Sequence, residues 1–365
     1  MMLTLPGLID PHVHMREPGQ THKEDWQSGT AAALAGGFTC VLAMPNTDPP
    51  LTDPASYDLA EGAAHKKALC DYGLFVGAGS GNVEAAARLA PKAVGLKMYL
   101  DRTFGPLQLK SRREIADHLA NWPLEKPVVV HAEGWNIPVA IVLAAKHKRS
   151  VHIAHVSRRE EILLIKAAKE KGLPVTCEVT PHHLFLTEDD IPRIGAGRAE
   201  VRPRLASKAD QKALWENLAV IDCFATDHAP HTLTEKDGEN PPPGFPGLET
   251  ALGLMLAAVH DGRLTVEVLL KRMYDNPRRI FQLPEQLSTM IQVDLDARWT
   301  VRGDFLKTRC AWTPFEGMTA RGKVVLVEIR GEPVYREPDV LARPGFGRNL
   351  IGWSLPAEPL RPIPM

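Results

Sequence analysis

The sequence predicts an α/β protein of the (β/α)8 TIM-type barrel class, with a small β appendage built mainly from its C-terminal segment. Two observations predict the barrel. Eight short apolar runs alternate with segments that fit a helix, which is typical of βαβ units and parallel strands. Most of these runs also end in a residue that can bind a metal or a substrate, and a barrel gathers its functional groups at the C-terminal ends of its strands. A doubly wound open sheet is the alternative, but it would draw less naturally on nearly every strand for one site.

The eight apolar runs are the expected strands, and each is short enough for a parallel barrel. They are residues 8–16, 38–46, 71–78, 93–99, 127–133, 151–156, 174–183 and 220–231. The segments between them fit a helix better than a strand, and they are residues 22–36, 54–67, 82–90, 111–121, 136–147, 158–171 and 209–218. The glycine-rich residues 77–81 lack the lysine of a phosphate-binding loop, so we interpret them as a turn between a strand and a helix.

The domain organisation follows from where this alternation stops. We expect the barrel to span residues 5–300 and the small β appendage to span residues 301–343, together with residues 1–4. Within the appendage, residues 323–335 predict two strands around an Arg-Gly-Glu turn. Residues 344–365 are rich in proline and glycine and lack periodicity, which predicts a linker or a loosely packed wrap. So little chain precedes the first strand that the appendage should be a reduced one.

The composition and charge of the chain argue against several classes of protein. The 365 residues carry a formal net charge of −1 and no long basic run, which argues against nucleic acid as the main partner. No signal peptide is evident and no apolar run is long enough to span a membrane. The five cysteines are scattered, odd in number and never in a C-x-x-C pattern, which is typical of a reduced, cytoplasmic protein.

The first apolar run contains the most informative pattern. His12 and His14 are two residues apart, so in a strand both imidazoles point to the same side. A surface strand can carry such a pair by chance, but other candidate ligands follow later strands. Together they are His12, His14, Lys97, His131, His155 and Asp227. Three or more imidazoles with a carboxylate suit Zn²⁺ or a similar divalent ion.

Three other histidines are expected to lie outside this ligand set. His152 is three residues before His155, so in a strand the two face opposite sides, and we assign His155 to the site and His152 to the outer layer. His182 and His183 are adjacent, so at most one of them can face the site. We interpret both as hydrogen-bonded histidines at a strand end.

Lys97 needs an explanation because a charged lysine inside an apolar strand loses its hydration. An ion pair with Asp227 or Glu178 is one explanation, and the residues alone slightly favour it. The other is a lysine of lowered pKa that reacts with CO₂ to give a carbamate, whose two oxygens can bridge two metal ions.

The chain resembles the amidohydrolase superfamily and, within it, the dihydroorotases. The resemblance is strongest to the dihydroorotase domain of the animal multifunctional carbamoyl-phosphate synthetase, aspartate transcarbamoylase and dihydroorotase polypeptide. It covers residues 3 to 335 and rests on motifs that together are highly specific. They are DPHVHMREPG at 10–19, MPNT at 44–47, GLKMYL at 95–100, HAE at 131–133, HIAHV at 152–156, CEVTPHH at 177–183, EVRP at 200–203, ATDHAPH at 225–231 and PPPGFPGLET at 241–250.

The resemblance implies a binuclear zinc site. Lys97 would be carboxylated and would bridge two Zn²⁺ ions, with His12, His14 and Asp227 completing the first metal's shell and His131 and His155 the second's. The implied reaction is the reversible cyclisation of N-carbamoyl-L-aspartate to L-dihydroorotate in pyrimidine biosynthesis. In the hydrolytic direction a metal-bridging hydroxide would attack the ring amide, and Asp227 would shuttle the proton to the leaving nitrogen.

The resemblance also implies the substrate contacts. Arg16, Asn46 and His231 would hold the free carboxylate, and Arg202 would contribute through its backbone or by ordering a loop. Arginine suits a carboxylate because its planar fork binds bidentately, whereas a surface salt bridge with Glu17 is the simpler alternative for Arg16. Residues 100–106 follow Lys97 directly, and Thr103 and Phe104 would close over the acyclic substrate as a mobile catalytic loop, unless this segment is an ordinary connection.

One residue departs from the pattern of some animal relatives. They carry a cysteine at the position of Ala154, and that cysteine accompanies an additional metal. Glu178 is present as a possible ligand of that metal, but alanine cannot ligate, so a third ion is not expected.

The remaining alternatives are a sibling cyclic amidohydrolase, such as an allantoinase or a dihydropyrimidinase, and an inactive dihydroorotase-like scaffold. Arg16 favours a substrate with a ring carboxylate, and the complete ligand set favours an active enzyme. A homodimer and membership of a larger pyrimidine-synthesis polypeptide are further expectations.

Overall fold

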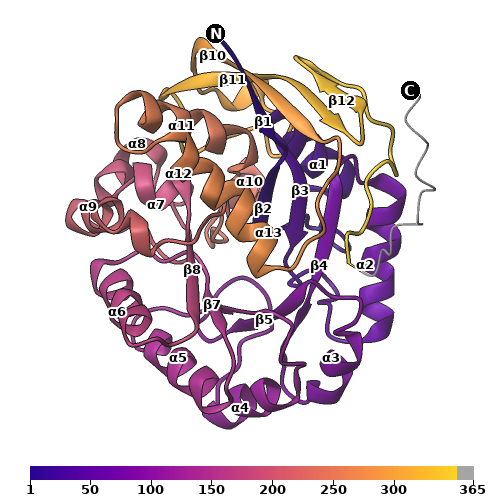
Figure 1. Cartoon of the computed structure of the whole chain (residues 1–365), viewed down its shortest axis with the longest axis vertical. Helices are drawn as coiled ribbons and strands as arrows, with labels where there is room; N and C mark the ends of the chain where they lie inside the picture. Colours follow the sequence, from indigo (N-terminus) through magenta and orange to yellow (C-terminus); the bar gives the residue numbers. More distant parts are fainter. Residues whose placement is uncertain (352–365) are drawn as a thin grey trace, which may run out of the picture.

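The computed structural model describes residues 1–351, and its centre is a barrel of eight parallel strands (Figure 1). The strands pair in sequence order from β2 to β9, and a parallel bridge between Val13 and His228 joins the last strand's end to the first. They are β2 (Leu8–Val13), β3 (Phe38–Ala43), β4 (Asp71–Gly77), β5 (Gly95–Tyr99), β6 (Val128–His131), β7 (Val151–Ile153), β8 (Val175–Val179) and β9 (Cys223–Phe224). All eight predicted strands are present, so the barrel class is confirmed.

Helices surround the barrel, and the seven predicted from the sequence are all present. They are α1 (Trp26–Ala35), α2 (Pro54–Lys67), α3 (Val83–Leu89), α4 (Arg112–Asn121), α5 (Asn136–Lys146), α6 (Arg159–Glu170) and α9 (Lys208–Glu216). Several start at a capping side chain: Asp53, Ser111 and Ser207 each accept a hydrogen bond from the backbone N–H three residues later. These caps satisfy N–H groups that would otherwise lack a partner at the start of the helix.

Further helices occupy the second half of the described chain and were not predicted. They are α7 (Pro181–Phe185), α8 (Ile191–Ile194), α10 (Leu233–Lys236), α11 (Leu248–His260), α12 (Val266–Leu270) and α13 (Asn276–Ile280), with short 3₁₀ or π turns at Glu188–Asp190, Leu218–Val220, Lys271–Asp275 and Gly303–Phe305. The longest, α11, lies between the barrel and the C-terminal sheet and is buried on most sides. It therefore lacks the polar face that reveals a surface helix in a sequence.

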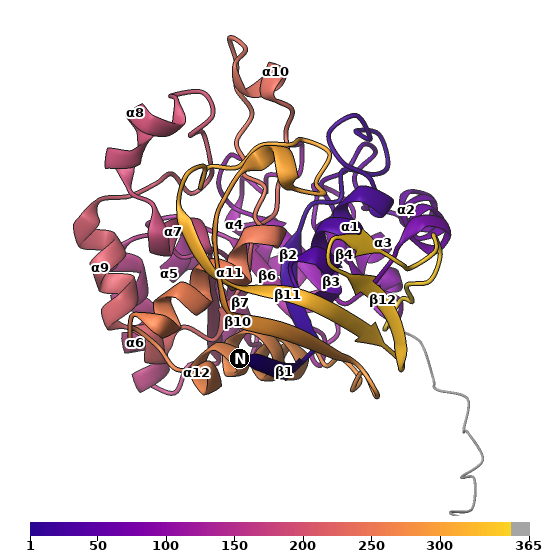
Figure 2. The same cartoon turned by 90° about the horizontal axis from the view of Figure 1, so that it is seen from above.

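A second sheet covers one side of the barrel, across α11 (Figure 2). Its strands are antiparallel in the order β1 (Met2–Pro6), β10 (Met290–Thr300), β11 (Thr319–Ile329), β12 (Glu332–Arg336) and β13 (Asp339–Val340). The two strands expected around the Arg-Gly-Glu turn are β11 and β12. The expected barrel range of 5–300 overlaps this sheet, because β10 pairs with β1 and β11 rather than with a barrel strand.

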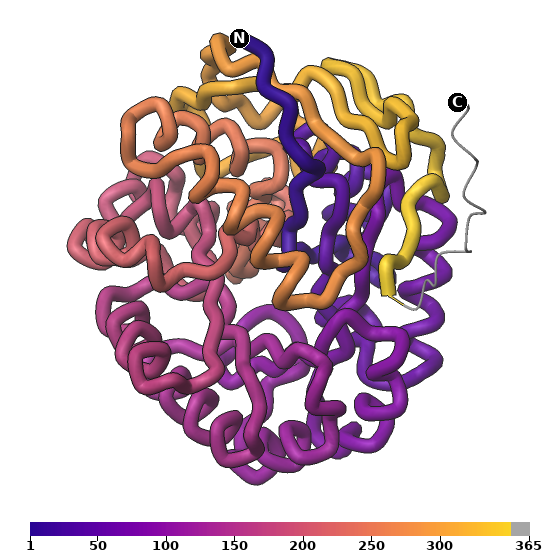
Figure 3. Tube along the Cα trace, in the orientation of Figure 1, coloured from indigo at the N-terminus to yellow at the C-terminus, as the bar shows by residue number. Residues whose placement is uncertain are grey.

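The described part of the C-terminal segment runs back along the barrel beside α2 and β4 (Figure 3). The Gly347 N–H donates to the Ala68 carbonyl at 2.9 Å. Tyr72 of β4 donates its N–H to Arg348 and accepts from Leu350, both at 2.9 Å. Residues 344–351 therefore form a hydrogen-bonded wrap, and the rest of the expected tail, residues 352–365, lies outside the described residues.

Candidate metal centre and active site

The C-terminal ends of β2 and β9 bring two imidazoles and a carboxylate together. The His14 Nε2 and His12 Nε2 atoms lie 3.1 and 3.4 Å from Asp227 Oδ1. Ligand atoms of His12, His155 and Asp227 all lie within 4.8 Å of one another, and the three side chains are buried. His155 and Asp227 have φ angles of +34° and +47°, which non-glycine residues rarely adopt and which are concentrated at functional sites.

The outer nitrogens of the first two histidines have carboxylate or amide partners. The His12 Nδ1 atom contacts Glu178 Oε1, and the His14 Nδ1 atom lies 2.6 Å from Asn46 Oδ1. When Nδ1 donates to an oxygen, Nε2 is left with a free lone pair. This arrangement is typical of metal-binding histidines, whose second nitrogen is held by a carboxylate or carbonyl.

Lys97 lies at the bottom of the same site, fully buried, with its Nζ 3.5 Å from His12 Nε2. Burial lowers the pKa of Lys97 to about 8, against the opposing influence of Glu178 and Asp227. No described carboxylate lies within 4 Å of its Nζ, so the expected ion pair with Asp227 or Glu178 is not formed. A buried lysine without an ion partner suits the amine chemistry that the alternative explanation requires.

His131 and His155 form the other half of the site. Their ring centroids lie 4.5 Å apart, and His131 Nε2 lies 3.2 Å from Glu133 Oε1. The Nδ1 atom of His155 is buried and has no hydrogen-bond partner. Since buried polar atoms are normally satisfied, this orphaned nitrogen fits a metal ligand.

Burial also sets the protonation states that metal binding needs. It lowers the pKa of His14 to about 4 and that of His155 well below its ordinary value, so both imidazoles are neutral near pH 7. The surrounding histidines, His12 first, hold the pKa of Asp227 well below its usual range despite burial. Neutral imidazoles and an ionised carboxylate are the ligating forms. The residues present therefore fit a divalent metal.

Of the predicted substrate residues, Arg16, Asn46 and Arg202 line the same cavity, whereas His231 is not part of its lining and contacts Arg16. Arg16 is buried, its Nε donates to the Pro230 carbonyl at 3.0 Å, and its Nη2 lies 2.9 Å from His231 Nε2. The alternative salt bridge is absent, because Glu17 pairs with Lys67 at 2.6 Å instead. The cavity walls are formed by His12, His14, Arg16, Asn46, Tyr99, Thr103, Phe104, His131, His155, Arg202, Asp227, Ala229, Pro243 and Gly244.

The loop after β5 lies inward over this cavity. The Asn46 side chain donates to the Phe104 carbonyl at 3.1 Å, and the Phe104 ring stands edge-on to His231 with centroids 5.1 Å apart. The Arg16 guanidinium carbon lies 5.2 Å from the Phe104 ring centroid. The loop therefore covers the end of the cavity where Arg16 lies, while the opening of the loop stays a prediction.

The structure corrects the expectation for His152. We expected this residue in the outer layer, but its Nε2 lies 3.1 Å from Glu178 Oε2 inside the barrel, and Glu178 also contacts His12. The strand β7 ends at Ile153, so the chain turns before His155 and both histidines face inward. Glu178 is thus held by two histidines. His183 is hydrogen-bonded as expected, whereas the buried His182 Nε2 has no partner.

Sequence reasoning missed three polar residues near the substrate end. Tyr99 lies two positions after Lys97 in β5 and lines the cavity, so strand periodicity could have found it. Lys23 lies with its Nζ 3.2 Å from His231 Nδ1, in a loop with no sequence signal. Lys236 lies beneath two loops that line the cavity, and nothing in the sequence distinguishes it from a surface lysine.

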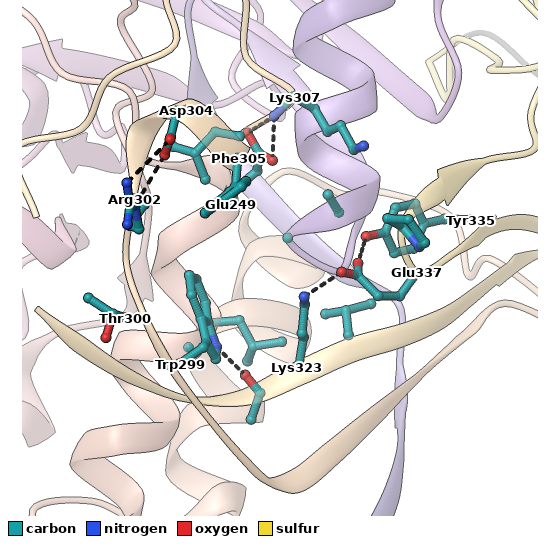
Figure 4. Close-up of a pocket in the computed structure, with 18 residues that line it drawn as sticks. Glu249, Trp299, Thr300, Arg302, Asp304, Phe305, Lys307, Lys323, Tyr335 and Glu337 are labelled. Carbon is teal, nitrogen blue, oxygen red and sulfur yellow. Dashed lines mark hydrogen bonds and ion pairs between the residues drawn. The ribbon is translucent and has the colours of Figure 1, made fainter. Parts of the chain in front are cut away.

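A larger cavity of about 630 Å³ lies elsewhere, between α1, α11 and the C-terminal sheet (Figure 4). Its polar groups make mostly structural contacts: Glu249 accepts from the backbone N–H groups of Lys307 and Thr308, and Lys323 pairs with Glu337. None of the candidate metal ligands lines it. The smaller cavity at the strand ends therefore remains the candidate site.

Comparison with known proteins places the chain in a family. The model of the amidohydrolase family matches residues 3–275. The dihydroorotase of Pyrococcus furiosus is 36% identical over 363 residues, which cover 93% of this chain and 83% of that protein. The chain belongs to the amidohydrolase family and, within it, to the dihydroorotases.

A second relative is much longer than this chain. The multifunctional protein pyr1-3 of Dictyostelium discoideum is 53% identical over 350 residues, which cover 96% of this chain but 16% of that protein. The chain thus spans about one sixth of the length of this multifunctional relative.

Solved structures show the same fold. The L-hydantoinase of Arthrobacter aurescens superposes with a TM-score of 0.91 at 26% identity, covering 96% of this chain and 89% of that one. An inactive dihydroorotase-like domain of a CAD-like multifunctional protein from Chaetomium thermophilum gives 0.83 at 29% identity, covering 96% and 99%. No described helix combines the length and apolarity needed to cross a membrane.

Proposed function

We propose that this dihydroorotase-family chain catalyses the reversible cyclisation of N-carbamoyl-L-aspartate to L-dihydroorotate. The proposal rests on one observation, which is that two groups of residues meet at the same cavity. The predicted metal ligands lie at one end, and the buried Arg16, which contacts His231, lies at the other. A carboxylate-bearing cyclic amide fits between a site that activates a carbonyl and a site that binds an anion.

The family membership and the donor set support two Zn²⁺ ions at the first end. His12, His14 and Asp227 would hold one ion, His131 and His155 the other, and a carboxylated Lys97 would bridge them. When bound, such ions polarise a carbonyl and lower the pKa of a bound water to about 7. Formation of the carbamate joins the Lys97 Nζ to the carbon of CO₂ and releases one proton. Ala154 next to Glu178 argues against a third ion.

Asp227 is proposed to move the proton of the reaction. In the hydrolytic direction, a water oxygen bonds to the ring amide carbon and its proton passes to an Asp227 carboxylate oxygen. The C–N bond then breaks, and the Asp227 acid gives this proton to the leaving nitrogen. The depressed pKa of Asp227 keeps the carboxylate ionised, which is the form that a proton acceptor must have.

Arg16, Asn46 and His231 are proposed to hold the substrate's free carboxylate. Burial lowers the pKa of Arg16 to about 10, which leaves the guanidinium charged at neutral pH. An arginine fork matches a carboxylate bidentately, so this charge selects a substrate that carries one. Arg202, which also lines the cavity and pairs with Glu200 at 3.1 Å, would order its loop around the substrate.

The bridging role of Lys97 has a direct test. Lys97→Ala should lose bound zinc and turnover together, and short carboxylic acids added to the variant should restore part of both. Electron density for the carbamate in a zinc-loaded crystal is the decisive measurement, because carbamates are labile in mass spectrometry. An unmodified lysine in such a crystal would overturn the bridge.

The two alternatives predict different assay results. A hydantoinase- or allantoinase-type enzyme would prefer dihydrouracil or allantoin, and an inactive scaffold would turn over nothing despite bound metal. We expect turnover of dihydroorotate and carbamoyl-aspartate, with the other two substrates far slower and with zinc measured on the same sample. Preference for dihydrouracil or allantoin would reject the proposed substrate, and a zinc-loaded but inert sample would reject the enzyme.

We further propose that the chain acts in the cytoplasm, as a homodimer and as one domain of a larger pyrimidine-synthesis polypeptide. The long multifunctional relative supports the last point. The five cysteines, all free and buried, support a reducing compartment. The dimer rests on the family resemblance, and light scattering of the purified chain would test it.

A further inference from the structure

The short helix α10 ends in a lysine whose side chain turns back beneath the substrate-binding loops. Lys236 is fully buried, and its Nζ donates to the carbonyl oxygens of Glu200 at 2.7 Å, Pro242 at 2.9 Å and Gly244 at 3.3 Å. An ammonium group has three N–H donors, so these three acceptors use all of them. The Phe245 and Trp312 rings flank the charge at 5.6 and 5.7 Å.

The three carbonyls belong to two loops that face the substrate end of the cavity. Glu200 precedes Arg202, and its side chain pairs with that arginine at 3.1 Å. Pro242 and Gly244 enclose Pro243, whose carbonyl lies 3.1 Å from His231 Nε2. The Gly244 N–H also donates to the Glu200 carbonyl at 3.0 Å, so the two loops meet directly above the ammonium.

The backbone at this junction has little room to move. Gly244 has a φ of +147°, and a Cβ there would lie 2.4 Å from the Ala229 carbonyl and 3.1 Å from His231 Cδ2. The Ala229 N–H donates to the Phe245 carbonyl at 2.7 Å, while the Trp312 indole donates to the His231 carbonyl at the same distance. A displacement of residues 242–245 would therefore shift His231 and the cavity wall.

We propose that Lys236 is a positioning residue that fixes Arg202, Pro243 and His231 for binding of the substrate carboxylate, without touching the substrate itself. This inference rests on the proposed function, because it assigns the substrate's carboxylate to the His231 end of the cavity. Its energetic basis is the high cost of leaving buried carbonyl oxygens without a donor. Burial lowers the pKa of Lys236 to about 7, with Glu200 opposing and Arg16 adding to this shift, and three carbonyl acceptors around the Nζ suit its protonated form.

The test compares two variants of the zinc-loaded chain. Lys236→Met keeps the length of the side chain but removes all three donors. Lys126→Met is the matched control, since Lys126 also donates to a backbone carbonyl, that of Ala93 at 3.0 Å, but it precedes β6 at the opposite end of the barrel. We expect Lys236→Met to raise KM for dihydroorotate about tenfold or more with kcat changed much less, and Lys126→Met to leave both unchanged.

Hydrogen–deuterium exchange supplies a readout that does not depend on catalysis. Peptides covering residues 199–204 and 240–246 should exchange faster in Lys236→Met than in the unmodified chain, with zinc content unchanged. A normal KM, a loss confined to kcat, or unchanged exchange would overturn the positioning role. If the unmodified zinc-loaded chain does not turn over dihydroorotate, the proposed function fails. Hydrogen–deuterium exchange then still tests whether Lys236 holds the two loops in place. If Lys236→Met does not fold, the same measurements can be made on Lys236→Gln, which keeps two donors.

Discussion

At the scale of single residues, Asp227 is proposed both to hold a metal ion and to move the proton, whereas other residues orient the metal-binding histidines. Asp227 can do both, because it contacts two histidines through one oxygen, Oδ1, and follows the last barrel strand with a backbone conformation that aims it inward. The contacts of Glu178 and Asn46 with the outer nitrogens of His12 and His14 orient these two histidines, and Asn46 is also proposed to hold the substrate carboxylate. Replacing Asp227 should therefore affect proton transfer directly, whereas replacing Glu178 should change the orientation of His12.

Asp227→Asn tests the proton role. The amide keeps an oxygen that can ligate, so much of the fold and part of the zinc should remain. It cannot accept and return a proton, so kcat should fall by about 10²- to 10⁴-fold, the usual contribution of a general acid–base group. Steady-state kinetics with zinc determination on the same preparation measures this, and near-normal turnover in the zinc-loaded variant would exclude the role.

Arg16→Gln tests the substrate class. The variant removes the buried charge that the substrate carboxylate would meet, and breaking such a pair costs about 2–5 kcal/mol. Binding of dihydroorotate and carbamoyl-aspartate should weaken accordingly, while zinc content stays unchanged. Arg204→Gln is the control, because Arg204 is largely exposed and pairs with Glu200 outside the cavity wall. Unchanged affinity in Arg16→Gln would mean that another residue holds the carboxylate.

Some helices and strands can be predicted from the sequence more easily than others. Strands and capped helices such as α4, which begins after Ser111, follow directly from period and capping pattern. The convergence of the candidate ligands at the strand ends was predicted too, since parallel strands of a barrel place their C-terminal ends together. The helix α11 was missed because burial on most sides removes its polar face. His152 was misplaced because the period of two holds only within the strand, and β7 is three residues long.

Contacts between loops were the least predictable part of the site. Lys23 contacts His231, and Lys236 contacts the Glu200 carbonyl in a loop of the cavity wall. Neither contact follows from the spacing of residues along a helix or a strand. The motifs identified the candidate site residues, but not the distant side chains that contact them. Long-range polar contacts depend on how loops of irregular backbone pack, and sequence spacing carries no information about that packing.

The loop of residues 100–106 allows a prediction at the scale of an element. Phe104 packs on His231, and its ring centroid lies 5.2 Å from the Arg16 guanidinium carbon and 4.6 Å from the Lys23 Nζ, so its inward position depends on these three residues. Thr103→Ala and Phe104→Ala should each lower turnover strongly without changing zinc content, since closure excludes water from the site. Phe305→Ala, at an exposed phenylalanine of the appendage, is the control. Normal turnover in both loop variants would reduce the loop to a connector.

At the scale of the whole molecule, the barrel and the C-terminal sheet are joined through α11 and the segment between β10 and β11. Glu249 of α11 accepts a hydrogen bond from the backbone N–H group of Lys307 at 2.7 Å (Figure 4) and another from that of Thr308 at 3.0 Å. The buried Glu24 accepts from Thr308 and Arg309 nearby. Two carboxylates therefore converge on one short segment, and their mutual repulsion must be relieved if both are to stay there.

This junction predicts how stability depends on pH. Burial, reinforced by the charge of Glu24, raises the pKa of Glu249 to about 8, above its ordinary value of 4.5. A group whose pKa is raised by folding contributes stability that is fully present below the unfolded pKa. That contribution is lost as the pH rises from about 4.5 through about 8, because the folded state then resists ionisation that the unfolded chain permits. The free energy of unfolding should therefore decline over this range.

Glu249→Gln isolates that contribution. The amide has nearly the same shape, can still accept from the backbone of residues 307 and 308, and does not ionise. Denaturant unfolding from pH 5 to pH 9 should show a shallower decline for this variant than for the unmodified chain, with the variant the more stable of the two at pH 9. Glu267→Gln is the control, since Glu267 is exposed on α12 and its pKa is lowered rather than raised. Parallel pH profiles for Glu249→Gln and the unmodified chain would show that Glu249 is ionised in the folded protein. The contact between the barrel and the sheet would then accommodate the charges of both Glu24 and Glu249.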